Sequence, residues 1–329
     1  MTEQANHAVS RRIAELEQFM PPLTAKDDFS AFWKTALQQA ASRPLQAMRK
    51  PQPSPMPYVD VFKVEYNGYD DTPIAGWFIV PRFAKQEKLP CLVHFHGYTG
   101  SKGYPEQYAQ FALMGMAVFA VDIRGQGGET GNLLPQQFGM TAGWMTQGIL
   151  DKDNCYYKAI TIDAMKALDW AAAQAEVDPE RIVAYGGSQG GGLVLVTAAL
   201  SDKPAIAIAD IPNMCHMDYG ILNSTGSVTE AARFLERFPD QLEAVLDTLS
   251  YFDVMNLADR IQIPLLVSCC LKDTISMPEM IFAAYNRITS PKEIQVYPFT
   301  GHAVVGYQNR RALEFITRHF FPERQQENG

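Results

Sequence analysis

Residues 182–196 read IVAYGGSQGGGLVLV, and this stretch decides the fold. A short apolar run precedes Ser188, and a small-residue stretch with helical character follows it. Gly186 and Gly190, two positions before and two after the serine, let the backbone double back between a strand and a helix. A serine on such a strained turn holds its hydroxyl where it can act as a nucleophile. The sequence therefore predicts a nucleophile elbow at Ser188.

The composition limits what this serine can belong to. A chain of 329 residues with 47% hydrophobic content can bury a large core. We expect one α/β domain over residues 1–329, with an N-terminal helical extension over 1–45 and a helical insertion over 211–262. The net charge of -8 argues against nucleic acid or an anionic membrane as a partner, because neither polyanion would be attracted.

The cysteines and the N-terminus bear on the compartment. No segment reaches the roughly 18 uncharged apolar residues of a membrane span, and the N-terminus lacks the apolar core of a signal peptide. The 5 cysteines are odd in number, and none falls in a C-x-x-C pair. We expect free thiols packed in the core of a cytoplasmic protein.

Short continuous apolar runs alternate with segments long enough to hold helices. This alternation predicts a mostly parallel central sheet covered by helices on both faces. Ahead of these runs, alternating apolar and polar residues at 59–66 and 74–80 predict an antiparallel hairpin. The expected buried strands lie at 91–95, 117–121, 182–185, 205–209, 264–270 and 294–297.

Helical patterns mark the remaining segments. Residues 9–19 and 29–41 are amphipathic and predict two helices that clamp the core. A pattern at 158–173 precedes the nucleophile, and another around 229–249 fills the insertion. Insertions after parallel strands lie over the carboxyl end of the sheet, where ligands bind, so we expect a lid or an interface there.

A nucleophilic serine needs a histidine as general base. On this type of turn the histidine comes last in the chain, after the acid. Three histidines follow Ser188: His216 lies in the insertion, His319 falls in a predicted terminal helix at 307–320, and His302 occupies a loop after the last expected strand. We therefore predict His302 as the base.

The base needs a carboxylate on its other ring nitrogen. Asp273 lies just past the expected strand at 264–270, where its side chain can reach His302. Asp253 and Asp259 are alternatives, but both precede that strand. We predict Asp273 as the acid that fixes the tautomer of the histidine and stabilises its charged form.

An oxyanion develops when the serine attacks a carbonyl, and it needs hydrogen-bond donors. One donor is expected from the backbone N–H of Gln189, the residue after the nucleophile. The other is expected from the loop after an early strand, which here reads His-Gly-Tyr-Thr-Gly at 96–100. We predict the backbone N–H of Tyr98 as this second donor.

The sequence gives no reason to expect a metal or another cofactor. His94 and His96 are the one close pair of histidines, and they fall in the segment already assigned to the oxyanion loop. We expect a mechanism with no cofactor.

Several motifs together resemble the acetyl xylan esterase and cephalosporin C deacetylase family, carbohydrate esterase family seven. The likeness extends over nearly the whole chain and includes Gly-Trp-Met-Thr at 143–146. The motifs are His-Gly-Tyr at 96–98, Arg-Gly-Gln-Gly at 124–127, Gly-Gly-Ser-Gln-Gly-Gly at 186–191, Leu-Ser-Tyr-Phe-Asp at 249–253, Phe-Ala-Ala-Tyr-Asn at 282–286 and Gly-His at 301–302.

The resemblance implies an α/β-hydrolase fold and removal of acetyl groups from short acetylated xylo-oligosaccharides and from cephalosporin C. It implies no cofactor, and a ring-shaped homohexamer whose active sites face an interior cavity. It assigns the triad to Ser188, Asp273 and His302, in agreement with the order of these residues along the chain. The Arg-Gly-Gln segment at 124–126 is expected to brace the end of the sheet.

Two positions depart from the family pattern. Ala303 stands where the family usually has a glutamate after its histidine, and we expect activity to survive this change. Residues 226–228, Gly-Ser-Val, replace a proline-containing stretch near the acyl pocket, which bears on the preference for acetyl groups.

Other activities use the same residues. An acetyl-enzyme can pass its acyl group to an alcohol or to peroxide, which would make the protein an acyltransferase or a perhydrolase. A short-chain carboxylesterase of broader acyl range is a further alternative. A binding module without activity conflicts with a full set of catalytic residues.

Overall fold

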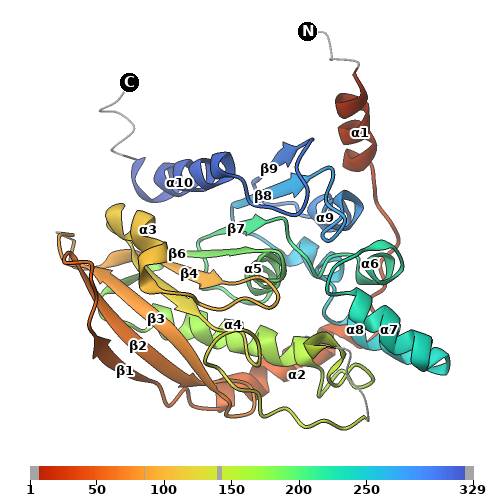
Figure 1. Cartoon of the computed structure of the whole chain (residues 1–329), viewed down its shortest axis with the longest axis horizontal. Helices are drawn as coiled ribbons and strands as arrows, with labels where there is room; N and C mark the ends of the chain where they lie inside the picture. Colours follow the sequence, from red (N-terminus) through yellow and green to blue (C-terminus); the bar gives the residue numbers. More distant parts are fainter. Residues whose placement is uncertain (1–6, 85, 139–142, 323–329) are drawn as a thin grey trace.

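The computed structural model of the chain describes residues 7–84, 86–138 and 143–322 (Figure 1). A nine-stranded sheet in the order β1-β2-β3-β5-β4-β6-β7-β8-β9 runs through the molecule. Strands β4 to β9 are parallel, whereas β1, β2 and β3 form an antiparallel end that joins β5. The strands are β1 (Met48–Gln52), β2 (Val59–Asn67), β3 (Pro73–Pro81), β4 (Leu89–Phe95), β5 (Ala117–Val121), β6 (Val177–Gly187), β7 (Ile206–Asp210), β8 (Leu265–Cys270) and β9 (Lys292–Tyr297).

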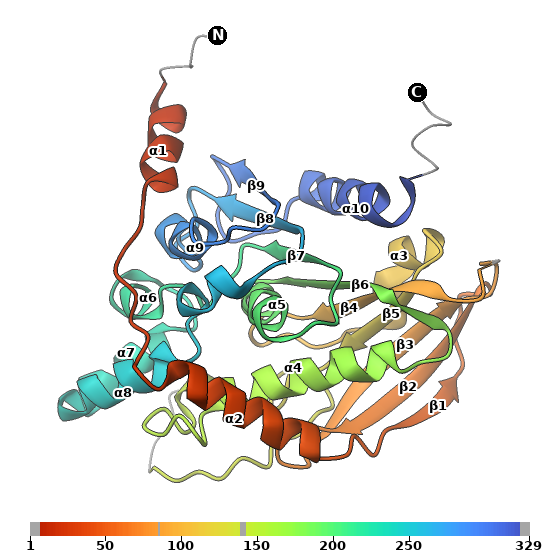
Figure 2. The same ribbon diagram turned by 180° about the vertical axis from the view of Figure 1, so that it is seen from behind.

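Helices cover both faces of the sheet (Figures 1 and 2). Strand side chains alternate between two apolar clusters: Val93 belongs to the cluster that includes residues of α2, α4, α5 and α9, whereas its neighbour Leu92 belongs to the cluster that includes residues of α3 and α10. The predicted mostly parallel sheet with helices on both sides is confirmed. The helices are α1 (Ala8–Glu17), α2 (Phe29–Ser42), α3 (Ala109–Leu113), α4 (Tyr156–Ala172), α5 (Gln189–Leu200), α6 (Met217–Asn223), α7 (Thr229–Arg237), α8 (Leu242–Ser250), α9 (Pro278–Tyr285) and α10 (Gly306–Phe320).

Strand β1 was not predicted from the sequence. Its residues Met-Arg-Lys-Pro-Gln are almost all exposed and pair only with β2, so no apolar alternation marks them. Pro51 is tolerated because an edge strand has one side free of ladder hydrogen bonds. Backbone pairing with β2 therefore stabilises this strand, and its own side chains contribute little.

The helical pattern predicted around 229–249 is not one helix. It divides into α7 and α8, and a short 3₁₀ turn, Pro239–Gln241, separates them. Proline disfavours helical backbone at the preceding residue, and Phe238 accordingly takes φ -129° and ψ 67°. The division of the chain into one domain with an extension and an insertion stays a prediction.

The N-terminal helices hold distant parts of the chain, as the clamp prediction requires. Trp33 of α2 is 1% exposed, and its indole N–H donates to the carbonyl oxygen of Tyr251 at 2.9 Å. Asn286, beyond α9, donates its side-chain amide to the carbonyl oxygens of Leu16 and Phe19. Within the described residues no helix is long and apolar enough to cross a membrane.

Replacing Trp33 by alanine tests this clamp. Trp33→Ala should lower the free energy of unfolding by about 3–5 kcal/mol, because it leaves a cavity against Phe252 and removes the hydrogen bond to Tyr251. Urea unfolding followed by circular dichroism measures the change. Lys34→Ala, on the exposed side of the same helix, is the control and should stay within about 0.5 kcal/mol of the unmodified protein. Equal losses in both variants would contradict the clamp.

Candidate active site

The turn at Ser188 has the backbone geometry of a nucleophile elbow. Ser188 joins β6 to α5 with φ 56° and ψ -121°, a strained conformation for a residue with a side chain. A Cβ atom on Gly190 would lie 2.0 Å from the carbonyl oxygen of Phe95, and one on Gly186 would lie 2.6 Å from the same oxygen. Both glycines are therefore needed for β4 to approach the turn.

A buried carboxylate supports the elbow from below. The backbone N–H of Ser188 donates to the carbonyl oxygen of Asp210 at 2.9 Å. The Asp210 carboxylate accepts hydrogen bonds from Tyr185 (3.1 Å), Ser268 (3.1 Å) and Gln308 (2.6 Å). Burial raises the pKa of Asp210 to about 6. This residue, which no sequence pattern predicted, joins β6, β7, β8 and α10 next to the serine.

The structure brings the three predicted side chains together. Nε2 of His302 lies 2.9 Å from Oγ of Ser188, and Nδ1 of the same ring lies 2.7 Å from Oδ2 of Asp273. The other carboxylate oxygen of Asp273 accepts the backbone N–H groups of Ile275 (2.8 Å) and Ser276 (3.0 Å). These two bonds fix the orientation of the carboxylate, so the remaining oxygen faces the ring.

The other two histidines have different surroundings. The ring of His216 stacks on Tyr219 with centroids 5.1 Å apart. Nδ1 of His319 lies 2.8 Å from the carbonyl oxygen of Phe315, one turn earlier in α10. Neither ring is in contact with the serine.

The two alternative acids have other surroundings. Asp253 accepts the backbone N–H groups of His216, Met217 and Met255 at 2.7 to 2.9 Å, and so holds the start of α6. Burial raises the pKa of this carboxyl group to about 7. Asp259 is exposed.

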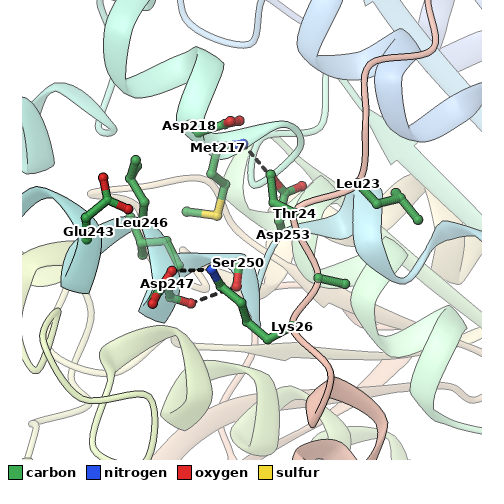
Figure 3. A pocket seen from close by; sticks show the side chains of 12 residues that line it. Leu23, Thr24, Lys26, Met217, Asp218, Glu243, Leu246, Asp247, Ser250 and Asp253 are labelled. Carbon is green, nitrogen blue, oxygen red and sulfur yellow. Dashed lines mark hydrogen bonds and ion pairs between the residues drawn. The ribbon is translucent and has the colours of Figure 1, made fainter.

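A pocket of about 380 Å³ lies beside Asp253, between the N-terminal segment and the insertion (Figure 3). Carboxylates line it, and Lys26 forms an ion pair with Asp247 at its wall (Figure 3). Ser188, Asp273 and His302 are not among its lining residues. This pocket is therefore separate from the elbow.

Both predicted oxyanion donors belong to segments that meet at the elbow. A Cβ atom on Gly97 would lie 3.6 Å from Cβ of Ser188, so the loop that carries Tyr98 approaches the serine closely. Gln189 follows the serine directly and begins α5. Within the described residues, no protein group accepts the backbone N–H of Tyr98 or of Gln189. Both amides are free to bind an oxygen atom of a ligand.

The ring of His96 orients the peptide group that contains the Tyr98 N–H. Its Nε2 accepts the backbone N–H of Ile123 at 2.8 Å, which leaves the proton on Nδ1. Nδ1 then donates to the carbonyl oxygen of Gly97 at 2.8 Å. Burial lowers the pKa of His96 and keeps the ring neutral. Because the peptide unit is planar, holding this carbonyl also sets the direction of the Tyr98 N–H.

Gln126 joins the two donor segments. Its side-chain oxygen accepts the backbone N–H of Thr99 at 2.9 Å, and its amide nitrogen donates to the side-chain oxygen of Gln189 at 3.1 Å. The neighbouring Arg124 is fully buried and binds Asp163 through two nitrogens. These contacts agree with the bracing role expected for residues 124–126.

No cluster of three metal-ligating side chains exists in the part of the chain that the structure describes. His94, the other member of the close histidine pair, lies 3.1 Å from the hydroxyl oxygen of Tyr108. Burial lowers the pKa of His94 to about 3, so this ring is also neutral. Both histidines are occupied by protein partners.

The five cysteines are free and buried, as predicted. Ala303 is exposed, and its carbonyl oxygen lies 3.6 Å from the sulfur of Cys270. In the other departing stretch, Val228 is fully buried, and a Cβ atom on Gly226 would lie 2.4 Å from Cγ2 of Ile275. The stretch at 226–228 therefore packs against the loop that carries Asp273.

Comparison with known proteins places this site in a family. The chain is 27% identical to the acetyl esterase Axe7A of Xylanibacter ruminicola over 309 aligned residues. These residues cover 92% of this chain and 69% of that protein. The structure of an acetyl xylan esterase from Paenibacillus sp. R4 superimposes with a TM-score of 0.90 at 39% identity, over 93% of this chain and 99% of that one. Acetyl xylan esterase 1 from Thermoanaerobacterium sp. gives a TM-score of 0.89 at 27% identity, over 94% and 98% of the two chains. The sequence profile described as Acetyl xylan esterase (AXE1) matches residues 8–319, and the chain therefore belongs to the acetyl xylan esterase family.

Proposed function

We propose that this protein is a serine esterase that removes acetyl groups from acetylated xylo-oligosaccharides and similar small acetate esters, cephalosporin C among them. The observation that carries the proposal is the continuous hydrogen-bonded chain from Ser188 through His302 to Asp273. Membership of the acetyl xylan esterase family supports the substrate class.

The first half-reaction forms an acetyl-enzyme. Oγ of Ser188 attacks the ester carbonyl carbon while Nε2 of His302 takes the hydroxyl proton. The backbone N–H groups of Tyr98 and Gln189 bind the oxyanion, and loss of one such donor costs about 10²–10³-fold in kcat. When the tetrahedral intermediate collapses, the bond to the sugar oxygen breaks and His302 returns the proton to that oxygen.

The second half-reaction releases acetate. A water molecule gives a proton to His302 and attacks the acetyl carbon, and the bond to Oγ of Ser188 breaks as the serine regains its proton. Asp273 stabilises the imidazolium in both halves without becoming protonated. Its two bonds from the amides of residues 275 and 276 keep it in place throughout the cycle.

Assembly and location are further parts of this proposal. We propose a cytoplasmic homohexamer, as the family resemblance implies. The five buried free thiols support a reducing compartment. Phe299 and Tyr307 flank the His302 loop and are 77% and 57% exposed, and an assembly would cover such apolar side chains.

Replacing the nucleophile tests the function. Ser188→Ala should lower kcat on p-nitrophenyl acetate by more than about 10⁴-fold, since the remaining groups have no oxygen atom to acylate. Mass spectrometry of quenched reactions should find one acetyl group added to the unmodified protein and none added to the variant. Ser201→Ala, at the opposite end of α5, is the matched control and should keep full activity. Acetylation of the Ser188→Ala protein at the unmodified rate would refute the proposal.

The length of the acyl group provides a second test. We expect acetate esters to be cleaved at least about 100-fold faster than octanoate esters, because a pocket sized for an acetyl group, as the family resemblance implies, would reject the extra methylenes. The family resemblance places residues 226–228 near the acyl pocket, and Val228 in this stretch is fully buried. The measurement is kcat/KM for acetate, butyrate and octanoate esters of p-nitrophenol.

A cavity-opening variant sharpens this test. Val228→Ala should raise the butyrate-to-acetate ratio several-fold, while Val305→Ala, beyond the His302 loop, should leave the ratio unchanged. A flat profile in the unmodified protein would contradict an acetyl-selective pocket and favour the broader carboxylesterase.

A further inference from the structure

The side chain of Tyr98 makes a contact that the mechanism above does not use. Its hydroxyl donates to Oε2 of Glu230 at 2.5 Å and accepts the backbone N–H of Met145 at 3.2 Å. Glu230 belongs to the first turn of α7, in the helical insertion, 132 residues away along the chain. One hydrogen bond therefore connects the insertion to the loop that supplies an oxyanion donor.

The surroundings of Glu230 are built around this contact. A Cβ atom on Gly143 would lie 2.0 Å from the carboxylate, so the backbone there leaves room for the carboxylate only because the residue is glycine. The ring of Trp144 meets the ring of Tyr98 edge to face, with centroids 5.3 Å apart. Burial raises the pKa of Glu230, and the hydrogen bond from Tyr98 partly offsets the rise. The segment at 143–145 and α7 thus enclose the Tyr98 hydroxyl.

The donor peptide group is held at its other end as well. Its carbonyl oxygen, on Gly97, receives the Nδ1 proton of His96 at 2.8 Å and the backbone N–H of Gly100 at 3.0 Å. These bonds hold the carbonyl end of this planar group, and the position of Tyr98 holds its N–H end. The side chain of Tyr98 is the next point at which the loop is anchored.

We propose that Glu230 is a positioning residue for the oxyanion hole: it holds the Tyr98 hydroxyl and so keeps the Tyr98 backbone N–H aimed at the oxygen that forms at Ser188. This inference rests on the proposed esterase function. Glu230 does not touch the reacting atoms. Through it, the placement of α7 sets how well the transition state is bound.

The expected signature is a loss in kcat with KM almost unchanged. An oxyanion donor acts mainly on the transition state, so misdirecting it weakens catalysis more than substrate binding. The loss should be about 10-fold, smaller than the 10²–10³-fold that removal of a donor causes, because the N–H remains but is no longer held.

Four variants assayed on p-nitrophenyl acetate test the role. Tyr98→Phe removes only the hydroxyl, and Glu230→Ala removes its acceptor. Each should lower kcat about 10-fold and change KM by less than about twofold. The double variant should be no worse than either single variant, because both break the same contact. Glu230→Gln keeps an acceptor oxygen and should recover kcat to within about threefold of the unmodified enzyme.

Matched controls separate positioning from stability. Glu236→Ala removes an exposed carboxylate from the same helix and should keep kcat unchanged. Melting temperatures of all variants are measured alongside. If Glu230→Ala does not fold, Tyr98→Phe, which loses a single oxygen atom, provides the result.

Three outcomes would overturn the proposal: a normal kcat in Tyr98→Phe, losses that multiply in the double variant, or a loss that appears in KM. Failure of the esterase function itself is distinguishable, because the unmodified protein would then be inactive on p-nitrophenyl acetate or no more active than the Ser188→Ala protein. An inactive Ser188→Ala protein beside a fully active Tyr98→Phe protein would refute the positioning role alone.

Discussion

The strained backbone at Ser188 is the constraint on which the rest of the structure depends. A residue with a side chain remains at φ 56° only where its surroundings enforce that conformation. Here β4 lies directly against the turn, through the carbonyl oxygen of Phe95, and the glycines at 186 and 190 make the approach possible. Parallel pairing of β4 with β6 then places the loop after β4 beside the serine, so one close contact positions both the nucleophile and a donor.

Buried charges hold the loops around this turn. Lys102 is 3% exposed and binds Asp122 at 2.8 Å and Glu129 at 2.7 Å, which joins the loop after β4 to the loop after β5. Arg124 binds Asp163 of α4 and Asp70 of the hairpin turn. Such pairs contribute little net stability, because desolvation offsets their attraction, but they require one arrangement of the loops. An oxyanion hole requires a fixed arrangement of these loops, because one of them carries the Tyr98 donor.

The sequence predicted those features that depend on local residue patterns and on the order of residues along the chain. The apolar runs predicted the parallel strands, and chain order together with loop position predicted the meeting of Ser188, Asp273 and His302. It was uninformative where a feature depends on a distant neighbour. Strand β1 exists because a hairpin offers it an edge, and the partner of Tyr98 lies in an insertion whose sequence carries no sign of that contact.

Two features could be understood only once the positions of their neighbours in the folded chain were known. Pro239 was visible in the sequence, but the amphipathic pattern on both sides of it suggested one helix where there are two. Asp210 closes a buried strand, and nothing local shows that three donors converge on its carboxylate from β6, β8 and α10. In both cases the missing information was the identity of the neighbour in space.

The docking of α2 also has a consequence for synthesis on the ribosome. The partner of Trp33 is 218 residues later in the chain, and the partner of Asn286 is 270 residues earlier. The apolar stripes of α1 and α2 therefore stay uncovered until residues 251 and 286 have been translated. Packing of α1 and α2 is therefore a late step of folding, because it requires residues 251 and 286.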